Sequence, residues 1–174
     1  MKAAVASAVT AGALLAGTTA AAAHPEHHRD GLDSVRSSTH AFHNVATAEQ
    51  HGYRLLTDVH GTACIDMPGK GGMGVHWAKS GLVEDPAILP RHPEALVYAP
   101  GSDGTLRLAA VEYVVVKQAW DARHRRAPKL FGHRFDVTGA PNRFGLPAFY
   151  SLHVWAQRHN SAGTFSMWNP KVAC

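Results

Sequence analysis

The sequence predicts a single α+β domain with a mostly antiparallel β-sheet, a helix near its N-terminus and long ordered loops. Three observations lead to this prediction. One early stretch has helical periodicity, several later stretches have strand patterns, and segments with Gly and Pro separate them. The chain has 174 residues, and about 150 remain after the expected signal is removed, which is the size of one domain.

Residues 1–23 are predicted to be a secretory signal peptide. Lys2 gives a short positive region, residues 3–16 form an apolar run too short for a membrane span, and small residues precede the expected cleavage after Ala23. No second apolar run follows, so we expect no membrane span and a secreted or extracytoplasmic protein. Residues 24–33, with "HPEHHRD", are predicted to be a flexible His-rich tail, and residues 34–174 the single domain.

The domain is predicted to begin with a helix over residues 34–51. Its apolar residues have helical spacing, the Asp-Ser pair at 33–34 can cap its start, and Gly52 can cap its end. "YRLLTDV" then predicts a short strand. Residues 64–74 contain one Pro and four Gly and predict a loop, from which "VHWA" emerges as a strand.

The later strands are clearer. "EALVYAP" and "TLRLAAVEYVVV" flank the turn-rich "PGSDG" and predict an antiparallel hairpin. Residues 120–147 are irregular, "FYSLHVWAQ" is a last strong strand, and turns or a short helix close the chain. Irregular segments that are ordered in a compact domain are often functional.

Cys64 and Cys174 are the two cysteines of the chain. In an oxidising compartment an isolated pair most simply forms one disulfide, which would close a loop of roughly 110 residues and contribute about 2–4 kcal/mol. Two cysteine metal ligands are the alternative, and they suit a reducing compartment better.

The charge balance is mildly basic, with 17 basic and 13 acidic residues and a net charge of +4. "RHRR" at residues 123–126 indicates a solvated loop or, as the alternative, a polyanion contact. No nucleic-acid motif accompanies it, so no nucleic-acid partner is expected. "GKGGMG" lacks the end of a phosphate-binding loop, so no nucleotide cofactor is expected.

Histidine is abundant, with 13 residues, and imidazole is the commonest metal ligand in proteins. His76, Glu112 and His153 each lie among apolar residues of a separate predicted strand. Burying an unpaired carboxylate is costly, so Glu112 needs a metal, a cation or strong donors. The alternatives are an exposed Glu112 or one paired with Arg107 or Arg134, and histidines bonded to the backbone. Strand periodicity places Glu112 on one face with Leu106, Leu108, Ala110, Val114 and Val116.

If these strands are neighbours, the three residues form a two-histidine, one-carboxylate site for a divalent transition metal, Zn, Fe or Cu. Gly71, Gly72 and Gly74 would then let the backbone approach the site, although a tight turn also explains them. The residues expected to line the pocket are Met73, Trp77, Tyr113 and Trp155. Trp120 and Trp168 are further candidates for its floor, and packing in the core is the alternative for all four tryptophans.

A second metal site is conceivable at the mature N-terminus, where His24 and its amino group can chelate copper with His27 and His28 nearby. A flexible tail does not preorganise such a site. Nucleophilic catalysis has little support, because no G-x-S-x-G motif occurs and the i, i+2 spacing of Ser151 and His153 does not establish a triad.

Six blocks occur in one order: "CIDMPGKGGMGVHW", "HPEALVYAP", "LRLAAVEYVV", "PKLFGHRF", "GLPAFYSLHVW" and "GTFSMWNPKVAC". Over residues 39–174 they resemble a family of exported bacterial proteins, common in actinobacteria and found in proteobacteria, that has no established activity. The resemblance implies an exported single domain and no particular chemistry. Two departures, Trp77 in place of a tyrosine and Asn160-Ser161 in place of Asn-Pro, do not involve a candidate ligand.

The sequence therefore predicts an exported domain that binds a metal or a small ligand, with a metalloenzyme as a further hypothesis if the metal keeps an open position. The alternative is a non-catalytic structural or interaction domain of the cell envelope, whose partner would be an envelope component. An enzyme acting on cell-wall polymers has no defensible pair of carboxylates in this sequence.

Overall fold

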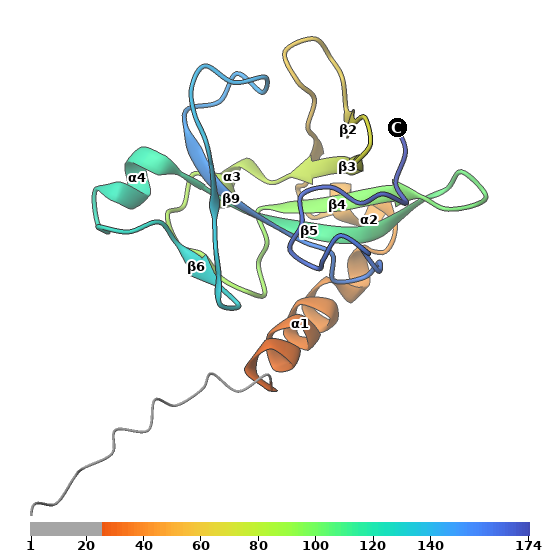
Figure 1. Cartoon of the computed structure of the whole chain (residues 1–174), viewed down its shortest axis with the longest axis horizontal. Coiled ribbons are helices and arrows are strands. Elements are labelled where there is room, and N and C mark those ends of the chain that lie inside the picture. The colour runs from red at the N-terminus through yellow and green to blue at the C-terminus, as the bar shows by residue number, and fades with distance from the viewer. Residues whose placement is uncertain (1–25) are drawn as a thin grey trace, which may run out of the picture.

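The computed structural model describes residues 26–174. The predicted signal peptide and His24 lie outside the described residues. The domain is α+β, and an antiparallel sheet with two helices on one side forms its centre (Figure 1).

The helix predicted over residues 34–51 is divided in two. Helices α1 (Glu26–Thr39) and α2 (Val45–Gln50) are joined by the 3-10 turn η1 (His40–Phe42). Asn44 starts the second helix, because its side-chain oxygen accepts a hydrogen bond from the backbone N–H of Thr47. Residues 26–33, predicted as part of a flexible tail, belong to α1 instead.

The main sheet has seven strands, and every pairing within it is antiparallel. The strand order is β1-β3-β4-β5-β9-β8, and β2 also pairs with β3. The predicted hairpin is β4 with β5, and the last strong strand is β9. The bounds are β1 (Arg54–Leu55), β2 (Cys64–Met67), β3 (Gly71–Ala78), β4 (Ala95–Pro100), β5 (Leu106–Val116), β8 (Asp136–Thr138) and β9 (Phe149–Val154).

Short elements connect these strands. Helix α3 (Ser80–Val83) follows β3, helix α4 (Lys117–Asp121) follows β5, and strands β6 (Lys129–Leu130) and β7 (His133–Arg134) pair as a separate two-stranded sheet. Among residues 26–174, no helix has the length and apolar character needed to cross a bilayer.

The two faces of the main sheet have different cores. On the helix face, Val35 of α1 and Ala48 of α2 pack with Leu96, Tyr98 and Tyr113 in the larger cluster. On the opposite face, a smaller cluster packs under the C-terminal segment; its members are Val97, Ala99, Ala109, Ala110, Trp155 and Val172. The opposite face is therefore covered by fewer buried apolar side chains than the helix face, which leaves room for a cavity.

A register shift in the hairpin corrects the predicted faces of β5. Val97 pairs with Ala110 but Tyr98 pairs with Leu108, so β5 contains one extra residue at this point. Leu106 and Leu108 consequently pack on the helix face, not on the face of Glu112. The strict alternation of side chains between the two faces fails here, because an inserted residue moves every earlier residue of the strand to the opposite face.

The stretch predicted as a loop, residues 64–74, is the hairpin of β2 and β3. Its glycines permit strand packing. Gly71 and Gly74 have φ of 91° and 87°, and an added Cβ would lie 2.1 Å from the carbonyl oxygen of Asn169 and 2.7 Å from Val97 Cγ1, respectively. The close neighbours are thus the C-terminal segment and β4, not the candidate metal site.

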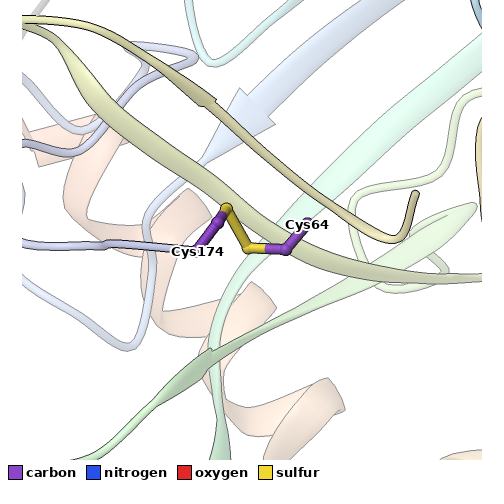
Figure 2. The surroundings of a disulfide bond; sticks show 2 residues. All are labelled: Cys64 and Cys174. Carbon is purple, nitrogen blue, oxygen red and sulfur yellow. A yellow bond between two sulfur atoms is a disulfide. The ribbon is translucent and has the colours of Figure 1, made fainter.

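The predicted disulfide between Cys64 and Cys174 is present (Figure 2). It joins β2 to the C-terminal segment. That segment also bonds to the start of β3, where the N–H of Gly72 donates to the carbonyl of Val172 and the N–H of Asn169 donates to the carbonyl of Gly72. The cross-link and these bonds hold the C-terminal segment against the sheet.

Candidate metal centre

His76, Glu112 and His153 come from three strands of the main sheet. Glu112 on β5 pairs directly with His153 on β9, so their side chains are neighbours on one face. His76 lies on β3, which is separated from β5 by β4. Ala95 on β4 pairs with both Glu112 and Ala78. Because Ala95 carries only a methyl group, the long side chains of His76 and Glu112 can meet above β4.

The three side chains form a compact, buried cluster. One candidate ligand atom from each residue lies within 4.8 Å of the other two. Nε2 of His76 is 3.2 Å from Oε2 of Glu112. The rings of His76 and His153 meet edge to face, with centroids 5.6 Å apart. The exposed fractions of His76, Glu112 and His153 are 6%, 8% and 4%, so solvent contributes little to this cluster.

Three buried nitrogens of the cluster make no well-aligned hydrogen bond to the described residues: Nε2 of His76, whose contact is the 3.2 Å ion pair with Glu112, and both ring nitrogens of His153. Nine in ten or more buried polar groups in proteins are hydrogen-bonded, and an unpaired one costs about 1–3 kcal/mol. The arginines considered as partners for Glu112 lie elsewhere, because Arg107 bonds to Asp103 and Arg134 is exposed on β7. The cluster is thus rich in polar atoms that lack the usual partners.

The charges of the cluster suit a cation. Burial raises the pKa of the Glu112 carboxyl, but His76 and His153, with a smaller effect of the Ser151 hydroxyl, outweigh burial and lower this pKa to about 2. Burial lowers the pKa of His153 to about 3, although Glu112 opposes the change. At neutral pH, Glu112 is therefore ionised and His153 is neutral, which are the states that ligate metals.

The donor set also fits a metal in size and kind. Ligand atoms about 2.0–2.2 Å from one tetrahedral ion lie roughly 3.4 Å from one another. The His76 and Glu112 atoms, 3.2 Å apart, already match that separation. The widest separation, up to 4.8 Å, requires a side chain to move inward. Within residues 26–174, His153 has no side-chain hydrogen bond that would hold its ring in place. Two imidazoles and a carboxylate suit Zn(II) or Fe(II).

A cavity of about 840 Å³ adjoins the cluster, and His76, Glu112 and Ser151 form part of its wall. Val114 and Val116 extend the same face of β5 along the cavity. This volume lies in the upper part of the range of small-molecule sites, about 300–1,000 Å³. A ligand in the cavity would therefore reach two of the candidate metal ligands, His76 and Glu112.

Two loops form the sides of the cavity. In the loop before β9, the Asn142 side chain accepts from the N–H groups of Phe144 and Leu146. In the loop before β2, the Asp58 carboxylate accepts from the N–H groups of residues 60 and 62. Arg143 joins the loops through an ion pair with Asp58 of 2.8 Å, and this contact lowers the pKa of Asp58. The loops rise together on one side of the sheet (Figure 1).

The predicted pocket residues divide between the two faces. Met73 lines the cavity, as does Trp168. Trp77 and Tyr113 instead pack in the helix-face core, because each lies one position from a candidate ligand along its strand. Trp155 lies beyond the end of β9 and stacks beside His153, with ring centroids 4.8 Å apart, without lining the cavity.

The sequence did not identify the cavity walls in the two loops. The only available signals were the irregular stretch over residues 120–147 and the Asn and Asp residues, which favour turns. Comparison of the chain with protein-family models, curated proteins and solved structures found no match. The resemblance to an exported family therefore remains an expectation.

Proposed function

We propose that His76, Glu112 and His153 bind one divalent transition metal ion, with Zn(II) and Fe(II) as the best candidates. The observation that carries this proposal is the set of three buried imidazole nitrogens that make no well-aligned hydrogen bond to the described residues and lie around a buried carboxylate. A metal ion would use one nitrogen of each ring and the charge of Glu112. It would thus bind two of these nitrogens and give the buried carboxylate a cation.

The chain supplies three protein ligands, which leave at least one coordination position for another molecule. Because His76 and Glu112 form part of the cavity wall, they would hold the ion where a molecule in the cavity could bind it. When bound, the ion would supply Lewis-acid chemistry, or redox chemistry in the case of iron. Glu112 would hold the negative charge, the neutral His153 would donate a lone pair, and the apolar walls would restrict water.

Export is part of this proposal. The expected signal peptide and the disulfide between Cys64 and Cys174 agree with an extracytoplasmic location. We infer that the protein acquires its ion outside the cytoplasm. A metal-dependent enzyme and a metal-dependent binding protein both fit the site.

Elemental analysis of untagged, exported protein tests the metal site. The variants Glu112→Gln and His153→Ala remove one ligand each, and Glu112→Gln preserves the shape of the side chain. His92→Ala is the matched control, because His92 is exposed and does not line the cavity. Zn, Fe and Cu are measured per mole of folded protein, with circular dichroism as the check of folding.

We expect about one equivalent of metal in the wild type and in His92→Ala, and a loss in both site variants, because three ligands set the affinity. Histidines of the N-terminal segment contribute equally to all four proteins. If the folded wild type contains no metal and does not take up Zn(II) or Fe(II), the proposal is wrong. The structural or interaction domain then becomes the better hypothesis.

A further inference from the structure

We infer that the 840 Å³ cavity binds a molecule with an elongated, uncharged apolar chain and one metal-ligating polar group at its inner end. The position of the polar group depends on the metal proposed above, whereas the apolar character of the ligand depends only on the cavity walls.

The walls of the cavity are mainly apolar side chains. Val114 and Val116 of β5 and Phe149 of β9 line the sheet side, and Phe144 and Leu146 line the loop side. Burial of apolar surface is the main source of affinity for such a site, at about 0.8 kcal/mol per CH2 group, or roughly fourfold in affinity. A long apolar chain is therefore the ligand class that these walls favour.

The charged residues of the wall do not provide an anion site. Arg143 is occupied by its ion pair with Asp58. Arg54 donates to the carbonyl oxygens of Glu49 and Tyr53. The remaining charged wall residues are the acidic Asp66 and Glu84, both exposed, together with Glu112 at the cluster. The described side chains of the wall thus offer no free cation, so the one cation that a ligand could meet in the cavity is the proposed metal ion at its inner end.

The mouth of the cavity is also apolar. Leu55 and Met67 line the cavity and are 48% and 38% exposed. Val59 is exposed as well and lies next to the wall, because its N–H bonds to the carbonyl of the lining residue Arg143. Exposed apolar side chains that gather at one opening indicate a binding site. An apolar ligand would keep contact with protein from the mouth inward.

The inner end of the cavity is where a polar group is needed. His76, Glu112 and Ser151 are its buried polar residues on the sheet side. A ligand with a polar group at one end and an apolar chain would place that group at this cluster and its chain along Val114, Val116 and Phe149. This arrangement explains why polar residues gather at one place in an apolar wall.

A homologous series of n-alkyl hydroxamic acids, from butyl to dodecyl, tests this inference by isothermal titration calorimetry. The hydroxamate is the metal-ligating group, and the chain is the apolar part. A second series, the n-alkyl alcohols of the same lengths, measures chain binding to protein freed of metal with a chelator. Alkyl sulfonates of equal length test the exclusion of anions.

We expect affinity to rise with chain length, by up to about fourfold per CH2 group, until the cavity is filled. Metal-loaded protein should bind hydroxamates more tightly than alcohols, and metal-free protein should bind sulfonates at least tenfold more weakly than alcohols. Leu55→Asp should weaken chain binding at least threefold. Leu89→Asp is the matched control, because Leu89 is 49% exposed and does not line the cavity.

The outcomes separate the ligand from the metal. Affinities that do not depend on chain length, or equal effects of Leu55→Asp and Leu89→Asp, would overturn the inference even if the protein contains stoichiometric metal. If affinity depends on chain length in a protein that takes up no metal, the apolar ligand is supported, and the metal has no part in recognising it. Tight sulfonate binding to metal-free protein would overturn the uncharged character of the chain site.

Discussion

Gly74→Ala is expected to destabilise the domain strongly. Gly74 has a φ of 87°, a conformation that costs an L-residue about 1–2 kcal/mol. An added Cβ would lie 2.7 Å from Val97 Cγ1 and 2.8 Å from the carbonyl oxygen of Tyr98, so β3 would have to move away from β4. Such overpacking costs about 1–3 kcal/mol. The sum, about 2–5 kcal/mol, is a large part of the 5–15 kcal/mol by which domains are stable.

Thermal unfolding followed by circular dichroism measures this effect. For a domain of about 150 residues, each kcal/mol lowers the melting temperature by about 2–4 °C, so the expected decrease is about 4–20 °C. Gly81→Ala is the matched control. Gly81 lies in α3, has no positive φ and has no atom within 4 Å of an added Cβ. A stability of Gly74→Ala within 1 kcal/mol of the wild type would refute the packing argument.

Three further predictions concern the cross-link, a buried acid and the metal centre. Replacing Cys64 and Cys174 by alanine removes a cross-link across 110 residues and should lower the free energy of unfolding in urea by about 2–5 kcal/mol. Burial raises the pKa of Glu94 from 4.5 to about 8. Between these two pH values the native state keeps a proton that the unfolded chain releases, so the free energy of unfolding falls as the pH rises from 4.5 to about 8. Glu94→Gln should therefore gain stability over the wild type above pH 8 and differ least near pH 5. Ala95→Val adds two methyl groups beneath the contact between the His76 imidazole and the Glu112 carboxylate. Because these groups would push the two side chains apart, metal binding should weaken at least tenfold while the sheet stays folded.

Each of these predictions has its own contrary result. Equal urea midpoints for the oxidised wild type and the double alanine variant would show that the cross-link adds nothing. A stability difference between Glu94→Gln and the wild type that does not change with pH would mean that Glu94 does not keep its proton. Ala78→Val is the control for Ala95→Val, and equal metal affinities in the two variants would show that the space at Ala95 is unimportant.

The sequence was informative wherever a strand was long and its pattern regular. The hairpin of β4 and β5, and β9 after it, could be predicted because they combine apolar and β-branched residues with a turn-rich connector. The polar residues His76, Glu112 and His153 were conspicuous within these strands, since buried polar groups need partners. Their convergence could not be predicted, because the order of strands in a sheet depends on long-range pairing.

The failures have local causes. The extra residue in β5 places Leu106 and Leu108 on the other face, and no residue type in the sequence indicates such an insertion. Trp77 and Tyr113 were expected to line the pocket, but each is next to a candidate ligand in its strand, and neighbours in a strand point to opposite faces. The glycines of β3 looked like a loop, because the close contact with the C-terminal segment involves residues about 100 positions away.

The strands β3, β5 and β9 have a consequence for the order of events during folding. His76 and His153 are far apart in the chain, and Glu112 meets His153 only after β9 has paired with β5. Pairings over such distances form slowly, because a long loop must close before they contribute stability. Any ion held by all three residues can therefore be bound completely only after these strands have paired. The supply of ions where folding ends would then decide which one the protein carries.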